Sequence, residues 1–237
     1  MSMAIGRAGA EIEFEVNAPG ERRSALAAYL ATPASNHGRG ILVIHDEWGL
    51  TDFIRDACDR LARAGFVALA PDLFRGRTAG DRVAAQQLAK ELDADRAAKE
   101  LGSAMLEIHN QSATTGAKIG ALGFGMGGQL ALLVASRERR LGAVVDFYGE
   151  HSEIDPDLTS VGASVLAILA DRGEAGPESE RHKLESTLRQ AQVRASIRVR
   201  DGARSGYMDD SRSDVHDAAA AAEGWDDLLA FFRSELG

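Results

Sequence analysis

A glycine-dense segment, Gly123-Phe-Gly-Met-Gly-Gly128, has the residue spacing in this chain that is most typical of a catalytic or ligand-binding turn. It lies between an apolar run and a run with helical spacing, which predicts a strand, a turn and a helix. Gly123, Gly125 and Gly128 match the G-x-G-x-x-G fingerprint of dinucleotide binding, with Asp146 placed to meet a ribose hydroxyl. The same turn also fits a nucleophile elbow, G-x-Nuc-x-G, with Gly125 at the nucleophile position.

The neighbouring segments favour the elbow. Ile41-Leu-Val-Ile-His-Asp-Glu-Trp-Gly-Leu50 and residues 59–74, together with the glycine turn, resemble the dienelactone hydrolase family of the α/β-hydrolase superfamily. The resemblance extends from about Ala28 to Phe232. It implies an α/β-hydrolase fold, with a mostly parallel central sheet flanked by helices on both faces. It also implies a family activity on esters or lactones, so dinucleotide binding stays a minor alternative.

Two positions of the family's catalytic triad map onto residues that cannot do its chemistry. Gly125 stands where the family has a cysteine or serine nucleophile, and glycine has no side chain with which to attack. The family's histidine follows the last strand, and the segment Gly202-Ala-Arg-Ser-Gly-Tyr207 places Ser205 there. Because a triad needs both a nucleophile and a base, the resemblance implies a degenerate triad.

The third triad position depends on the alignment of one loop. Aligning the loop after the strand at 165–170 on Pro177 puts the family's acid at Gly173. Asp171 and Glu174 flank that position, and either could replace the acid after a small shift of the loop. All three triad positions therefore lack the expected residue, and triad hydrolysis is predicted to be absent.

Backbone groups of an oxyanion hole survive the loss of side chains. The resemblance assigns these donors to Met126 and to a residue near Glu47, so a carbonyl or carboxylate could still bind there. It also places Asp46 where the family has a glutamate that contacts the resting nucleophile. Asp46 and Glu47 together would repel an anionic ligand or raise the pKa of one carboxyl group. The alternative is that both are solvated loop acids.

Further pocket candidates follow predicted strands, at the edge where open α/β sheets bind ligands. They are His45, Arg75, Tyr148, His151 and Tyr207. Each histidine could equally be a packing or loop residue. The resemblance places a basic substrate-binding residue near Arg75, which could then receive a carboxylate; the alternative is an exposed loop arginine. The sequence contains no His/Cys spacing typical of a metal site, and no cofactor is expected.

These residues support two main hypotheses. In the first, the protein is a non-catalytic homologue, a pseudoenzyme, that binds a small molecule or a partner in the vestigial pocket. In the second, it is an atypical ester or lactone hydrolase in which Asp46 or Glu47 activates water, with His45 or His151 assisting.

The elements that must position these residues alternate along the chain. An opening β-hairpin is predicted from 11–16 and 24–31. Strands are predicted at 40–45, 66–70, 118–124, 143–147, 165–170 and 196–200, and the first two are apolar runs typical of buried strands. Helices are predicted at 51–64, 82–109 (in one or two pieces), 128–136, 179–192 and 218–236. Regular alternation of strand and helix indicates a mostly parallel sheet with helices on it.

Composition is consistent with one α/β domain over residues 1–237. The apolar fraction of 45% suffices for a large core, and the net charge of −9 disfavours binding to nucleic acid or to an anionic membrane. One cysteine excludes an internal disulfide, and no apolar run is long enough for a signal peptide or a membrane span. We expect a soluble, cytoplasmic monomer or homodimer whose ligand is a small ester, lactone or carboxylate.

Overall fold

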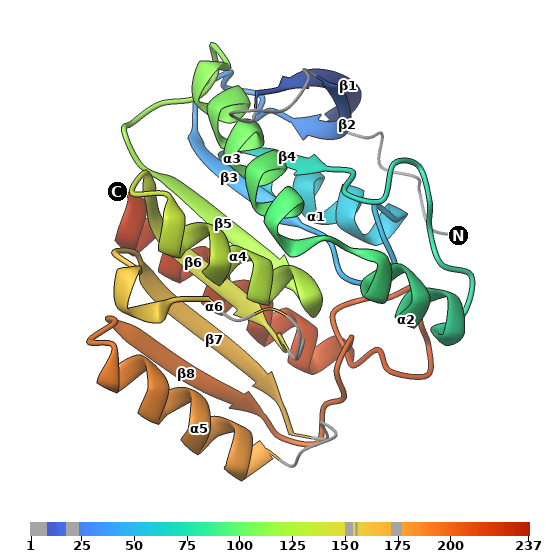
Figure 1. The fold of residues 1–237 in the computed structure, drawn as a ribbon, viewed down its shortest axis with the longest axis vertical. Coiled ribbons are helices and arrows are strands. Elements are labelled where there is room, and N and C mark those ends of the chain that lie inside the picture. Colours follow the sequence, from blue (N-terminus) through green and yellow to red (C-terminus); the bar gives the residue numbers. More distant parts are fainter. Residues whose placement is uncertain (1–8, 18–23, 150–153, 155, 172–176) are drawn as a thin grey trace.

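One eight-stranded sheet organises the protein. The computed structural model describes residues 9–17, 24–149, 154, 156–171 and 177–237 (Figure 1). The strand order is β1-β2-β4-β3-β5-β6-β7-β8. The first two strands form an antiparallel hairpin, and β2 also pairs antiparallel with β4. All pairs from β4 to β8 are parallel.

The strands lie close to their predicted positions. Their bounds are Gly9–Val16 (β1), Ser24–Ala31 (β2), Arg39–Ile44 (β3), Phe66–Pro71 (β4), Ile119–Phe124 (β5), Leu141–Phe147 (β6), Ser164–Ala170 (β7) and Ala195–Arg200 (β8). Strands β4 to β7 are buried along their whole length. Continuous apolar runs such as these are typical of parallel strands that are covered on both faces.

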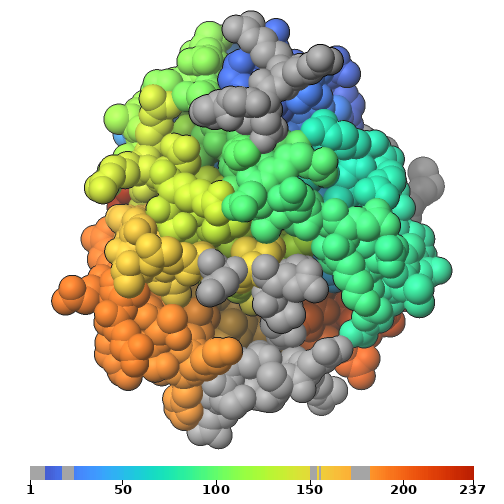
Figure 2. All heavy atoms as spheres, in the orientation of Figure 1, coloured from blue at the N-terminus to red at the C-terminus, as the bar shows by residue number. Residues whose placement is uncertain are grey.

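Helices cover both faces of the sheet. Their bounds are Asp52–Arg63 (α1), Arg82–Glu91 (α2), Ala94–Asn110 (α3), Met126–Arg137 (α4), Pro177–Gln190 (α5) and Ala218–Leu236 (α6). One face carries α3, α4 and α5, whose side chains cover the sheet in the space-filling view (Figure 2). The opposite face carries α1 and α6 (Figure 1).

The alternation of side chains along each strand divides the core into two parts. In β3, Leu42 and Ile44 pack on the side of α3 and α4, whereas Ile41 and Val43 pack on the side of α1 and α6. Successive strand residues point to opposite faces. A fully apolar strand can therefore serve both cores, as the sequence predicted.

The predicted helical segment 82–109 is two helices. The first ends at Glu91, and the second begins after Asp93, whose carboxylate accepts a hydrogen bond from the N–H of Arg96 at 3.0 Å. An aspartate in this position stabilises a helix start because it satisfies an otherwise free backbone donor. The break separates α2 from α3, which packs on the sheet.

Parallel strands bring their carboxyl ends to one edge of the sheet. Beyond this edge lie the loop after β3, the start of α4 after β5 and the residue after β6. The loop between β8 and α6 passes beside α2 (Figure 1). No helix in the described part of the chain is long and apolar enough to cross a membrane.

Candidate functional site

The turn between β5 and α4 has the strained geometry of an elbow. Gly125 has φ +52° and ψ −122°, a conformation that residues with a side chain adopt only at a cost. Its N–H donates to the carbonyl of Phe147 at 2.9 Å, and its carbonyl accepts from the N–H of Gly128 at 2.9 Å. The chain therefore keeps, at Gly125, the sharp turn that would present a nucleophile.

Close packing accounts for the other glycines of the fingerprint. A Cβ atom at Gly123 would lie 2.1 Å from the carbonyl oxygen of Gly127, and one at Gly128 would lie 1.8 Å from Oδ1 of Asp146. Asp146 is 1% exposed, and its carboxylate accepts from the N–H of Gly149 at 3.0 Å. This arrangement turns Asp146 inward against the elbow, so its carboxylate is not presented to a ribose.

Two carboxyl groups from the loop after β3 converge on the elbow. A Cβ atom at Gly125 would lie 3.0 Å from Oε2 of Glu47 and 3.4 Å from Cβ of Asp46. Asp46 is 2% exposed, and its Oδ1 accepts from the N–H of Trp48 at 3.0 Å. The Glu47 side chain thus lies against the space that a nucleophile's side chain would fill.

Burial and a like charge keep Asp46 protonated at neutral pH. Burial is the larger cause and the charge of Glu47 the second, and together they raise the pKa of Asp46 to about 8. Arg212 opposes this shift without reversing it. The expectation that two neighbouring acids would raise the pKa of one of them therefore has a basis in the geometry, and the buried member, Asp46, is the one affected.

A cavity of about 790 Å³ opens above these groups. Its walls come from Asp46, Glu47 and Trp48 after β3, from Gly125 and Met126 at the elbow, from Tyr148, from Gly80 to Ala89 in and before α2, and from residues 204–206 and 211–215 in the loop between β8 and α6. The cavity lies at the carboxyl ends of β3, β5 and β6, where the sequence placed it.

The backbone donors assigned to an oxyanion hole are free within the described chain. Neither the N–H of Met126 nor that of Glu47 donates to another described residue. Met126 is the first residue of α4, where backbone N–H groups have no partner within the helix. These two groups are thus available to a ligand oxygen or to a carboxylate.

Several polar atoms in the cavity wall are buried without a hydrogen-bond partner among the described residues. They are Trp48 Nε1, the Tyr148 hydroxyl and Oγ of Ser205. Tyr148 has φ +44°, and burial, followed by the charge of Asp46, raises the pKa of its hydroxyl well above its usual value. Buried polar groups are almost always paired, so these three atoms are available to a hydrogen-bonding partner in the cavity.

His45 does not reach the cavity. It is completely buried; its Nδ1 lies 2.7 Å from the carbonyl oxygen of Asp46, and its Nε2 accepts from the N–H of Leu73 at 3.2 Å. Burial lowers its pKa, so the ring is neutral and both nitrogens are engaged with backbone. Of the two interpretations of His45, the geometry favours the packing residue.

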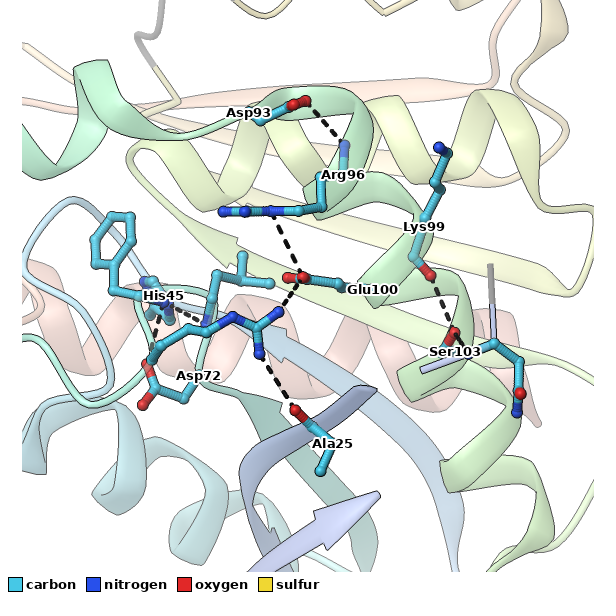
Figure 3. A network of polar contacts seen from close by, with 12 residues as sticks. Ala25, His45, Asp72, Asp93, Arg96, Lys99, Glu100 and Ser103 are labelled. Carbon is cyan, nitrogen blue, oxygen red and sulfur yellow. Dashed lines mark hydrogen bonds and ion pairs between the residues drawn. The ribbon is translucent and has the colours of Figure 1, made fainter. Parts of the chain in front are cut away.

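Arg75 also points away from the cavity. Its guanidinium pairs with the buried carboxylate of Glu100 at 2.5 Å and donates to the carbonyl of Ala25 at 3.3 Å (Figure 3). Arg96 lies 3.7 Å from the same carboxylate. These contacts fix the loop after β4 to α3 and leave Arg75 no part in receiving a cavity ligand.

The remaining candidates lie in different places. Tyr207 is fully buried and packs against Tyr148, with ring centres 5.5 Å apart, but does not line the cavity. Asp171 accepts from the N–H of Gly202 at 3.0 Å, which ties the end of β7 to the loop after β8. His151, Gly173 and Glu174 lie outside the described residues.

Sequence reasoning missed the residues that the loop between β8 and α6 brings to the cavity. Arg212 lies over the ring of Trp48, 4.7 Å from its centre, and pairs with the buried Asp209 at 3.0 Å. Arg204 and Ser211 line the same wall. The signal was the length of this polar loop, because long loops between regular elements commonly carry function.

No group of acidic, histidine or cysteine residues suited to a metal ion occurs within the described chain.

Comparisons with known proteins identify the family and the fold. The sequence model of the dienelactone hydrolase family matches residues 26–236. Protein usf of Aquifex pyrophilus is 30% identical, over 96% of this chain and 99% of its own. A protein of Aquifex aeolicus provisionally named a carboxymethylenebutenolidase is 31% identical, with the same coverage. A crystal structure from Klebsiella pneumoniae, provisionally described as a dienelactone hydrolase, superposes with a TM-score of 0.78 at 25% identity, over 95% of this chain and 99% of that one.

Proposed function

This chain belongs to the dienelactone hydrolase family, and we propose that it is a member that binds a small molecule in the family's cavity without hydrolysing it through a triad. One observation carries the proposal: the elbow keeps its strained turn at Gly125, but the nearest side-chain atom to its missing Cβ is a carboxylate oxygen of Glu47, at 3.0 Å. The catalytic position has no nucleophile, and an anionic side chain lies against its space.

The other cavity groups support binding. The wall offers unpaired buried polar atoms on Trp48, Tyr148 and Ser205, and the free N–H groups of Met126 and Glu47. Ser205, at the triad's histidine position, lines the cavity but has a hydroxyl rather than an imidazole. A hydroxyl cannot take the role of the general base at neutral pH. A water molecule that attacked a bound ester would therefore lack the usual acceptor for its proton.

The test is a search for acyl transfer on the whole protein. Incubation with 4-nitrophenyl acetate should give no burst of nitrophenolate above the rate of buffer, and the intact mass of the protein should not change. A burst with an acetyl group added to the protein would overturn the proposal. The variant Gly125→Cys serves as a chemical control, because a thiol at the elbow should acquire the acetyl group that the native chain does not.

A second function has a specific observation in its favour. Asp46, with its pKa raised to about 8, lies beside Glu47 in the cavity. One protonated and one ionised carboxyl group are the pair that general acid–base hydrolysis uses. In that case Glu47 would take a proton from water as the water attacks a carbonyl carbon, and Asp46 would give its proton to the leaving oxygen.

This acid–base hypothesis predicts a pattern that differs from acyl transfer. Turnover of an ester or lactone would proceed without a burst or a protein adduct, and both Asp46→Asn and Glu47→Gln would abolish it. The His45→Ala variant is not informative here, because that ring holds the backbone of Leu73. Turnover that survives in both carboxyl variants would exclude the pair as its source.

A further inference from the structure

The carboxylate of Glu47 is an uncompensated charge in the cavity. It makes no hydrogen bond and no ion pair with any other described residue, although it lines a cavity of about 790 Å³ together with Asp46. Its close neighbour is another acid, so the floor above Gly125 is negative. A carboxylate that is partly removed from water without a partner is costly, and a hydrogen-bond donor or a cation that binds to it offsets that cost.

The arginines of the cavity are held by other groups. Arg212 pairs with the buried Asp209 at 3.0 Å and lies over the Trp48 ring. Arg204 donates to the carbonyl of Asp214 at 3.4 Å. The remaining guanidinium, that of Arg82, also has a partner. None of them forms an ion pair with Glu47 or Asp46 among the described contacts, so the three cationic side chains leave both carboxyl groups without a bonded cation.

A second, independent feature points to a ligand at this floor. Tyr148 is 3% exposed, lines the cavity, and has a hydroxyl with no partner. Burial, followed by the charge of Asp46, raises the pKa of this hydroxyl, so it remains a neutral group that can accept a hydrogen bond. Tyr148 and Trp48 also provide aromatic surface, which attracts cations and apolar rings.

We propose that the cavity binds a small organic cation, a primary ammonium compound with a short apolar body, whose ammonium group lies on the floor formed by Glu47, Asp46 and Tyr148. Three N–H donors of an ammonium group suit two carboxyl groups and a hydroxyl oxygen. The apolar body would lie along Trp48 and Met126. The inference rests on the proposed function, because it uses the same cavity and supplies the class of its ligand.

Binding of a cation should release a proton. Asp46 is protonated at neutral pH because of its burial and the charge of Glu47. A positive charge placed between the two carboxyl groups offsets their repulsion and lowers the pKa of Asp46. The proton then leaves Asp46 for the solvent, and the ammonium group replaces it. Arg212 keeps its ion pair with Asp209, and Arg204 keeps its hydrogen bond to the carbonyl of Asp214.

The experiment compares three probes that share one ring and differ in charge: benzylammonium, benzyl alcohol and benzoate. Calorimetry on the whole protein at pH 7 and 0.15 M salt should show benzylammonium binding at least tenfold more tightly than benzyl alcohol, with benzoate weakest. Repeating the benzylammonium titration in two buffers with different heats of ionisation should show proton release. The release should disappear in Asp46→Asn.

A matched pair of variants separates the floor from the general charge of the protein. Glu47→Gln should weaken benzylammonium at least tenfold and leave benzyl alcohol within threefold. Glu13→Gln removes the same charge from an exposed position on β1 that does not line the cavity. It should leave all affinities within threefold. Circular dichroism should show both variants folded.

The result that overturns the inference is distinct from the result that overturns the proposed function. Benzoate or benzyl alcohol binding as tightly as benzylammonium, or no saturable binding of benzylammonium below about 10 mM, excludes the cation. An equal loss of affinity in Glu13→Gln excludes the floor as its site. Acyl transfer to the protein would instead sink the proposed function and leave the ligand class standing.

Discussion

Two groups of polar residues lie side by side at the carboxyl edge of the sheet, and they are built in opposite ways. Around the end of β4, both nitrogens of His45 are engaged, and the carboxylate of Glu100 has two arginines (Figure 3). Around the end of β3, Glu47 and the Tyr148 hydroxyl have no partner among the described residues. The polar groups of the first are paired within the protein, whereas those of the second are left unpaired by the described residues, which is why we propose a ligand there.

Asp46 connects the two groups. Its carbonyl oxygen belongs to the first group, because it lies 2.7 Å from Nδ1 of His45. Its carboxyl group belongs to the second, beside Glu47 over Gly125. Substitutions in the first group should therefore change stability, and substitutions in the second should change binding and its dependence on pH.

His45→Ala should have the largest effect on stability, a loss of about 3 kcal/mol. The substitution leaves a void where the ring packs 4.8 Å from Phe74, and it leaves the N–H of Leu73 without an acceptor. Urea unfolding followed by circular dichroism measures the change. His109→Ala, at an exposed site on α3, is the control. A loss no greater than that of the control would mean that His45 is free for another role.

Gly125→Ala should cost about 2 kcal/mol, because a side chain is strained at φ +52° and meets Glu47 at 3.0 Å. Two causes can be separated in a double-mutant cycle with Glu47→Ala. Removing Glu47 should recover the part of the loss that comes from the contact and leave the part that comes from the backbone. Simple additivity of the two substitutions would show that Glu47 does not occupy the nucleophile's space.

Glu100→Gln should cost about 1.5 kcal/mol. The carboxylate is 4% exposed, but its partners Arg75 and Arg96 are 42% and 49% exposed and can turn to water, which limits the loss. The matched control is Glu91→Gln, which breaks the exposed pair with Arg77 and should leave thermal unfolding unchanged. Ligand binding in the cavity should persist in both variants. Loss of ligand binding in Glu100→Gln would show that the two groups of polar residues are energetically coupled.

The sequence was sufficient for the fold and for the elbow, since both depend on local patterns. Apolar runs identified each buried strand, and the contiguous glycine frame located Gly125. It could not say which way a side chain turns. His45, Asp46 and Glu47 are consecutive, yet the first is buried against Leu73, the second is buried over the elbow, and the third faces the cavity. The direction of each side chain depends on its contacts with the residue after β4, Leu73, and with the elbow before α4, Gly125.

The partners of the site were also beyond sequence patterns. Arg212 and Trp48 are far apart in the chain and meet only because the loop before α6 returns to the end of β3. The expected role of His45 followed from its position after a strand, and that of Arg75 from its position together with the family resemblance. Position after a strand predicts proximity to the cavity edge, but the available backbone acceptors and Glu100 decide where these side chains point.

Asp46→Asn should have almost no effect on stability in acid, and should stabilise the protein in base. The pKa of Asp46 is raised from 3.8 to about 8 on folding. Between these values the folded state holds a proton that the unfolded chain has released, so the stability of the native protein falls as pH rises through this window. Asparagine is neutral at every pH and keeps the oxygen that accepts from Trp48. The variant should match the native protein near pH 4 and exceed it by at least about 1 kcal/mol at pH 9. Denaturant unfolding at a series of pH values measures the stability of both proteins. Parallel curves of stability against pH would show that Asp46 is ionised throughout, as a carboxylate with its own partners would be.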